Sequence, residues 1–231
     1  MANFPMNNAA YPGTAVDSRA EFISRTYTHL VGGILGFVLV ELALFESGLA
    51  GEIARFMFGF NWLLILGAFM LTGWLATRTA QTSASLGMQY FSFAVYVVAE
   101  ALIFVPLLYI ADAKAPGTID SATLVTFLGA GGLMLVAHRT RKDFSFMRAL
   151  LMWGGILALL AIVGGAIFGF RLGTWFSVAM IGFAGAAVLY DTSNIIHRYP
   201  EDRYVSAAMQ LFASIALMFW YVLRLTMGSR S

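Results

Sequence analysis

The chain has 231 residues, of which 60% are hydrophobic and 11% are charged, and its mean hydropathy is +0.79. A soluble domain carries about 25% charged residues, so this composition excludes a water-soluble fold and predicts an integral membrane protein. The net charge of +2 is too small for a nucleic-acid patch, and the absence of cysteine excludes disulfides, thiol chemistry and cysteine metal sites.

In chain order, residues 1–23 are polar at first and are predicted to form a flexible tail. Seven apolar helices are predicted after it, because each run is close to the roughly 20 residues that cross a bilayer. They are 24–45, 56–77, 86–111, 119–137, two passes within 149–190 that turn at Arg171, and 204–225. We therefore expect an all-α transmembrane domain over residues 24–226 and a short tail over 227–231. The runs lack the strict alternation of a membrane β-barrel.

The basic residues divide unevenly between the two ends of this predicted bundle. Five belong to the end opposite the amino terminus, and nine belong to the same end as the amino terminus: Arg19, Arg25, Arg78, Arg139, Arg141, Lys142, Arg148, Arg198 and Arg203. An excess of Lys and Arg marks the cytoplasmic side. The count predicts a cytoplasmic amino terminus and an external carboxyl terminus.

Asp191 is the acid of greatest interest, because the run before it, 174–189, contains no charge. A charged side chain at a helix centre costs about 2.5–3.5 kcal/mol on insertion scales, so it usually faces protein or water. Arg78 ends the second predicted span on the same side of the membrane. Two interpretations stay open: Arg78 forms an ion pair with Asp191, or it extends to the lipid headgroups.

Glu100 lies near the middle of the third predicted span, at the end of a polar stripe with helical spacing: Gln89, Ser92, Tyr96 and Glu100. It either lines a proton- or ion-contacting site or is a protonated carboxyl group that hydrogen-bonds a neighbouring helix. Glu41, near the far end of the first span, is expected to be interfacial.

A second polar stripe follows the last predicted helix, at Ser206, Gln210, Ser214 and Tyr221. A polar stripe on a membrane helix faces other helices or water, so this helix is predicted to be at the centre of the bundle. Pairs of small residues, at Gly32 and Gly36, Gly165 and Gly169, and Gly182 and Ala186, have the spacing of close helix contacts.

Motifs for hydrolytic chemistry are missing from the sequence. It contains no H-E-x-x-H, no G-x-S-x-G and no glycine-rich loop after a strand. We expect a protein that is not an enzyme and has no cofactor. The three histidines, at predicted helix ends, are expected to be interfacial rather than metal ligands.

Several stretches resemble the Bax inhibitor (transmembrane Bax inhibitor motif) family, most closely its bacterial YccA-like branch. The resemblance rests on Y-V-V-A-E-A-L-I-F-V-P at 96–106, T-R-K-D-F-S-F at 140–146, Y-D-T-S-N-I-I-H at 190–197 and L-F-A-S at 211–214. It implies a seven-helix bundle around the last helix, with a cytoplasmic amino terminus, in a bacterial inner membrane.

Family members are described as pH-sensitive calcium leak channels, in which two aspartates share a proton and an arginine latches the closed state. The resemblance places Asp191 at the first aspartate, as a candidate calcium contact, and Arg78 at the arginine. Ser214 takes the place of the second aspartate, so the repulsion between two carboxylates that creates a proton switch is missing.

Three hypotheses remain at this point. The chain is a calcium leak pathway gated near Asp191, with calcium as the transported ion and Glu100 along the route. Alternatively, it modulates, or is a substrate of, a membrane-anchored ATP-dependent protease, through residues 1–23 and the basic loop and without ion flux. The third is a structural bundle in which Asp191 only satisfies Arg78. The expected partners are the lipid bilayer and, under the second hypothesis, the protease. We expect a monomer or weak oligomer.

Overall fold

The computed structural model describes residues 12–83 and 85–228, and in these ranges it contains helices and no strand. Seven of the described helices are long and apolar enough to cross a membrane, which confirms the predicted all-α polytopic architecture. They are α1 (Pro12–Glu46), α3 (Trp62–Thr82), α4 (Leu86–Lys114), α5 (Thr118–Thr140), α6 (Met147–Phe168), α7 (Thr174–His197) and α8 (Tyr204–Gly228). Two short helices complete the fold: α2 (Leu49–Phe58) and a 3₁₀ turn, η1 (Glu201–Arg203).

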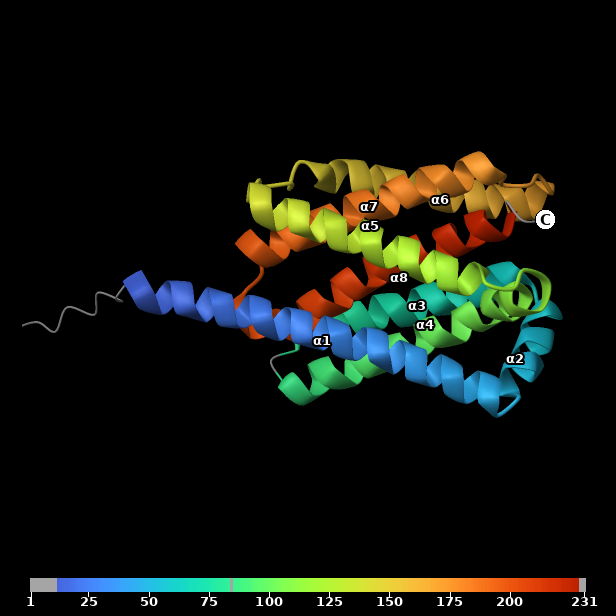
Figure 1. Cartoon of the computed structure of the whole chain (residues 1–231), viewed down its shortest axis with the longest axis horizontal. Helices are drawn as coiled ribbons and strands as arrows, with labels where there is room; N and C mark the ends of the chain where they lie inside the picture. The colour runs from blue at the N-terminus through green and yellow to red at the C-terminus, as the bar shows by residue number, and fades with distance from the viewer. Residues whose placement is uncertain (1–11, 84, 229–231) are drawn as a thin grey trace, which may run out of the picture.

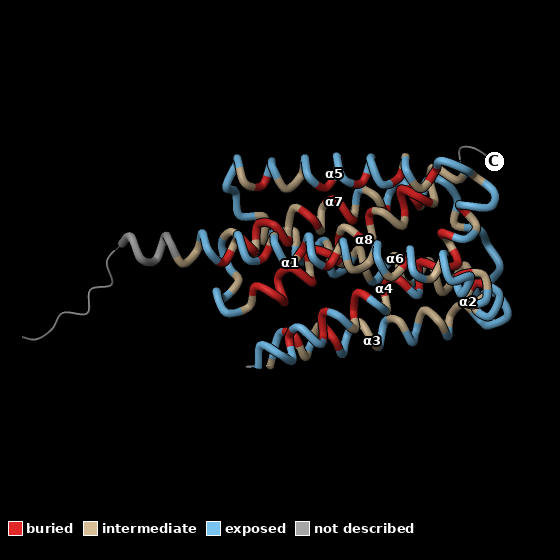
Figure 2. Tube along the Cα trace, turned by 60° about the horizontal axis from the view of Figure 1, so that its bottom comes forward, coloured by how far each residue is buried: buried red, intermediate tan, exposed pale blue. Residues whose placement is uncertain are grey.

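The last helix, α8, occupies the centre of the bundle, as its polar stripe predicted. It packs against α1, α3, α4, α5 and α7, and the other helices surround it (Figure 1). Buried residues gather around α8, whereas the outer faces of α3 and α5 are largely exposed (Figure 2). In contrast, α6 contributes no buried residue. The apolar outer faces match a lipid environment.

The predicted tail over residues 1–23 needs a correction for its second half. Helix α1 begins at Pro12, and Figure 1 shows its start projecting past the ends of the other helices. Proline is tolerated in the first turn of a helix, where its missing N–H would have no partner. Residues 1–11 and 229–231 lie outside the described residues.

The predicted second span, 56–77, also differs from the structure. Residues Leu49–Phe58 form the separate helix α2, and the membrane helix α3 begins only at Trp62. Asn61 sets this start, because its side chain accepts a hydrogen bond of 2.9 Å from the Leu63 amide. Ala50 and Ala54 of α2 are buried and pack with Val105, while Phe56 and Phe58 are exposed. Helix α2 thus separates the first two spans.

The turn predicted at Arg171 is present between α6 and α7. Gly169 ends α6 with φ of 76°, a left-handed conformation that glycine adopts without a steric penalty. At the other end of the bundle, α5 and α6 are joined by residues 141–146, which contain much of the predicted basic loop. We call the end of the bundle that holds this loop and the start of α1 the basic end.

The small-residue pairs are only partly right. A Cβ atom at Gly32 or Gly182 would meet nothing within 4 Å, so these two glycines allow no close approach. The tight contact belongs instead to Gly33, where a Cβ atom would overlap the ring of Phe93 on α4. Gly36 has an ordinary contact with Val97. The packing of α1 against α4 therefore rests on a glycine outside the predicted pairs.

Candidate functional site

Asp191 and Ser214 meet in the interior between α7 and α8. The Ser214 hydroxyl donates a hydrogen bond of 2.5 Å to Asp191 Oδ2, and the two residues are 3% and 6% exposed. The resemblance placed Ser214 at the position of the second aspartate, and the structure brings it into contact with Asp191. The buried carboxyl group therefore has a neutral hydroxyl as its partner.

Apolar side chains seal this pair on the side of the basic end. Ile195 on α7 and Leu211 on α8 are fully buried, and Tyr199 follows the last turn of α7. Burial raises the pKa of Tyr199, and the nearby Asp191 charge raises it further, which places the Tyr199 ring close to the carboxyl group. Buried side chains thus lie between Asp191 and the basic end.

Of the two interpretations of Arg78, the ion pair with Asp191 is not found among the described residues. Arg78 is exposed, and its guanidinium lies 5.2 Å from the centre of the Trp74 ring on the same helix. Within the described residues, the ion pairs are Arg25–Glu21, Arg198–Asp143 and Arg203–Asp202. A guanidinium at a helix end gains more from water and an aromatic face than from entering a sealed interior.

Arg19 is a structural partner of α7 that sequence reasoning missed. Its guanidinium donates to the carbonyl oxygens of Ile195 (2.6 Å), Ile196 (3.1 Å) and Tyr199 (2.5 Å). These groups include the unpaired carbonyls at the end of a helix, where a positive charge is favourable. Arg19 thus ties the start of α1 to the helix that carries Asp191. Its charge was counted in the sequence, but no pattern indicated this partner.

The residues after Asp191 hold the basic loop. Ser193 Oγ accepts a hydrogen bond of 3.0 Å from the Phe144 amide and donates one of 3.3 Å to the Lys142 carbonyl. Arg198 forms an ion pair of 2.8 Å with Asp143 in the same loop. The segment from Asp191 to Arg198 therefore contacts α8 through its first residue and the basic loop through later ones.

Glu100 lies in the middle of α4 and is buried. The other members of its predicted stripe are also buried: Gln89, Ser92 and Tyr96. The Tyr96 side chain, one turn earlier, lies beside the Glu100 carboxyl group. Glu100 also lines a cavity of about 860 Å³ that reaches Leu217 on α8. Ser214 precedes Leu217 by three residues, about 4.5 Å along the helix axis. The cavity thus ends about one turn from the Asp191–Ser214 pair.

Two further expectations concern Glu41 and a metal contact at Asp191. Glu41 is 7% exposed and has no hydrogen-bond partner among the described residues, so it is buried in the bundle and is not interfacial as predicted. Among the same residues, no group of three or more His, Asp or Glu side chains is placed to hold a metal ion. A calcium contact at Asp191 therefore has no preformed cage.

The fold and the site define a class: a polytopic membrane protein in which six membrane helices surround a central seventh, with an interior acid on the neighbouring helix. The model of the family "Inhibitor of apoptosis-promoting Bax1" matches residues 19–231. The chain belongs to this Bax inhibitor family, as the resemblance predicted.

Three proteins that are similar to this chain come from bacteria. PA2604, an uncharacterised protein of Pseudomonas aeruginosa, is 31% identical over 121 residues, or 51% of this chain and 53% of its own length. An uncharacterised membrane protein of Vibrio cholerae is 32% identical over 116 residues, 48% of this chain and 50% of its own. The Escherichia coli protein named modulator of FtsH protease YccA is 35% identical over 81 residues, 35% of this chain and 36% of its own. The chain spans about half the length, or less, of these relatives.

Proposed function

We propose that the protein is a calcium leak pathway in a closed state, with its gate at the Asp191–Ser214 contact. The observation that carries the proposal is the serial arrangement of an accessible cavity and a sealed acid. The cavity includes Glu100 and ends at Leu217, and the Asp191–Ser214 pair lies about one turn beyond it, toward the basic end.

A cation that moved through the cavity toward the basic end would meet Glu100 first and Asp191 next. Each carboxyl group offers oxygen atoms in place of part of the hydration shell that the ion loses in a low-dielectric interior. Calcium takes 6–8 oxygen ligands at a stable site, and the described residues contain no group of three or more His, Asp or Glu side chains that could hold a metal ion. This arrangement favours transient contact over storage of the ion.

The closed state follows from the side chains beyond Asp191. Ile195 and Leu211 are fully buried and offer no polar atom to an ion. A hydrophobic constriction of this kind stops conduction because water leaves it. Opening requires α7 and α8 to separate, and the first contact to break is the hydrogen bond between Ser214 and Asp191.

The orientation of the pathway is part of the proposal. The nine basic residues at the basic end support its placement in the cytoplasm, with the cavity on the external side. The gate would then regulate entry into a bacterial cell through its inner membrane. The Escherichia coli relative of strain CFT073 carries the name inner membrane protein YccA.

The test is calcium uptake into liposomes that contain the purified protein, from about pH 5 to 8. Wild-type protein should give flux above empty liposomes, and Asp191→Asn should change it. Ser214→Asp should add a pH dependence within this range, because two carboxyl groups in contact cannot both hold a charge without a large penalty. Glu52→Gln, which removes an exposed acid on α2, is the matched control and should behave as wild type.

Absence of flux for the wild type and all variants, with folding verified by circular dichroism, would reject the leak pathway. Equal flux for wild type and Asp191→Asn would reject Asp191 as the gate.

The second candidate is a contact modulator of a membrane-anchored ATP-dependent protease. It is favoured by the name of the Escherichia coli relative, modulator of FtsH protease YccA. The start of α1 projects past the bundle, where a membrane-anchored partner can reach it (Figure 1). Co-reconstitution with such a protease distinguishes the candidates: a modulator alters degradation of a third protein, loses this effect when residues 1–11 are deleted, and conducts no calcium.

A further inference from the structure

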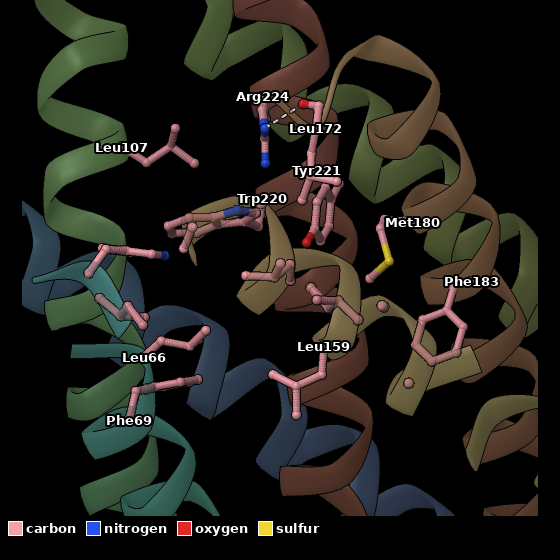
Figure 3. A pocket seen from close by; sticks show the side chains of 18 of the residues that line it. Leu66, Phe69, Leu107, Leu159, Leu172, Met180, Phe183, Trp220, Tyr221 and Arg224 are labelled. Atoms are coloured by element: carbon pink, nitrogen blue, oxygen red, sulfur yellow. Dashed lines mark hydrogen bonds between the residues drawn. The ribbon is translucent and has the colours of Figure 1, made fainter. Parts of the chain in front are cut away.

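The cavity that contains Glu100 lies between α3, α4, α6, α7 and α8, with the loop between α6 and α7 at one end. Figure 3 shows Arg224 and Leu172 at that end, and Phe69 and Leu159 toward the other. Aliphatic and aromatic side chains make up most of the lining, and the aromatic ones include Trp62, Phe69, Phe104, Trp220 and Tyr221. Its volume of about 860 Å³ falls in the range of about 300–1,000 Å³ for small-molecule sites.

Glu100 lacks a hydrogen-bond partner for one carboxyl oxygen in this largely apolar cavity. The residue is 6% exposed, and its Oε2 atom is buried without a hydrogen-bond partner among the described residues. The Tyr96 side chain lies beside the carboxyl group but leaves this oxygen without a partner. Buried acids are normally paired, and an intramembrane acid that is not paired within the protein points to a ligand or ion.

The two basic residues of the lining do not fill that role. Arg224 donates a hydrogen bond of 2.8 Å to the Leu172 carbonyl at the loop end, and Arg171 belongs to the loop itself. Arg224 follows Leu217 by seven residues, about 10.5 Å along α8. The positive charges and Glu100 are thus at opposite ends of the cavity.

We infer that this cavity is a binding site for lipophilic organic cations, with Glu100 as the counter-charge. Aromatic faces attract cations, and a carboxylate among them provides the opposite charge. The apolar lining selects molecules whose charge is surrounded by hydrocarbon. Such a ligand can enter from the lipid between α3 and α6, because α6 contributes no buried residue and both arginines lie at the loop end.

A hydrated metal ion suits the same site less well. Glu100 is the only acid among the lining residues, whereas a bound divalent cation requires several oxygen ligands. An anionic amphiphile could use Arg171 and Arg224, but it would leave Glu100 unpaired in contact with hydrocarbon. The unmet carboxyl oxygen favours the cation.

Two probes of the same shape and opposite charge separate these possibilities. Tetraphenylphosphonium and tetraphenylborate are each titrated by equilibrium dialysis against the full chain in nanodiscs of zwitterionic lipid, with empty nanodiscs subtracted. We expect tetraphenylphosphonium to bind at least tenfold more tightly than tetraphenylborate. Glu100→Gln should weaken phosphonium binding at least tenfold, and Glu52→Gln should leave it unchanged.

A second variant protects the test against a folding defect in Glu100→Gln. Ala158→Trp places a large side chain on the cavity wall of α6, a helix with no buried residue, and leaves Glu100 in place. It should reduce phosphonium binding by occupying the volume. Tighter binding of tetraphenylborate, or phosphonium binding that neither Glu100→Gln nor Ala158→Trp reduces, would overturn the inference.

This inference does not depend on the leak pathway. Phosphonium binding without calcium flux would support the cation site and reject the leak pathway. Calcium flux without phosphonium binding would support the leak pathway and reject the cation site.

Discussion

Two of the buried acids, Asp191 and Glu100, differ in their surroundings. Asp191 has a hydroxyl partner from another helix and lies behind a seal of apolar side chains. Glu100 has Tyr96 of its own helix beside it, has an unpartnered carboxyl oxygen and lines a cavity. The first arrangement couples a carboxyl group to helix packing, and the second leaves one available to a ligand or ion. This contrast is the basis for assigning the gate to Asp191.

Ser214→Ala should destabilise the folded protein by about 1–3 kcal/mol, because it leaves a buried carboxyl oxygen without its donor. Thermal unfolding in detergent micelles measures the effect. Ser47→Ala removes a hydroxyl group from an exposed position and serves as the control. A variant of Ser214 as stable as the control would mean that the hydrogen bond contributes nothing to the closed state.

Arg19→Gln should lower stability by about 2–3 kcal/mol, since hydrogen bonds that involve a charged group are the stronger ones and three carbonyls lose their donor. The matched control is Arg25→Gln on the same helix. Arg25 pairs with Glu21 at the surface, where an ion pair contributes about 0–1 kcal/mol. Equal unfolding midpoints for the two variants would contradict a role for Arg19 in anchoring α7.

At the scale of elements, the basic loop is attached to α7 by an ion pair that depends on pH. The Arg198 guanidinium, with the Ser145 amide, holds the pKa of Asp143 below its usual value. Because the folded-state pKa is lower than the unfolded one, the pair contributes stability above about pH 4 and loses it as the pH falls through the folded-state pKa.

The difference in unfolding midpoint between wild type and Asp143→Asn should therefore be largest near neutral pH and shrink on acidification. Salt should also reduce it, since both partners are half-exposed. Glu46→Gln, at the exposed end of α1, should show no such trend. A difference that is constant from about pH 3 to 7 would exclude the ion pair as its source.

The contact between α1 and α4 supplies a matched pair of adjacent glycines. Gly33→Ala should cost about 1–3 kcal/mol, because the new methyl group overlaps the Phe93 ring and the helices must separate. Gly32→Ala meets nothing within 4 Å and should be neutral or stabilise by up to about 1 kcal/mol through helix propensity. Thermal unfolding of both variants in detergent micelles measures the difference. A Gly33→Ala variant more stable than Gly32→Ala would contradict this packing.

The sequence predicted the membrane helices because long apolar runs leave little choice, and it predicted the central α8 from its polar stripe. It placed the ends less well: α2 was not separated from α3, since a capping residue such as Asn61 is a weak signal beside continuous hydropathy. The sequence left open whether Arg78 pairs with Asp191, and it did not predict the contacts of Arg19. Both depend on which helix ends meet, which charge and spacing within one helix do not determine.

At the scale of the whole molecule, the two ends of the bundle are built differently. The basic end carries the anchored α1, the docked basic loop and the seal, whereas the cavity reaches the α6–α7 loop at the opposite end. No sequence pattern predicted the cavity, because a void between helices depends on how side chains from five of them pack. The asymmetry becomes functional only when each end is assigned to one side of the membrane.

This assignment can be tested directly, because the chain contains no cysteine and an introduced thiol is the only one present. Arg141→Cys lies in the connection at the basic end, and Lys114→Cys at the last residue of α4, near the opposite end. In spheroplasts of a bacterial host, a membrane-impermeant maleimide should label Lys114→Cys at once. Arg141→Cys should react only after permeabilisation, because basic loops stay in the cytoplasm. The opposite pattern would place the cavity on the cytoplasmic side and reverse the direction in which the Asp191 gate controls entry.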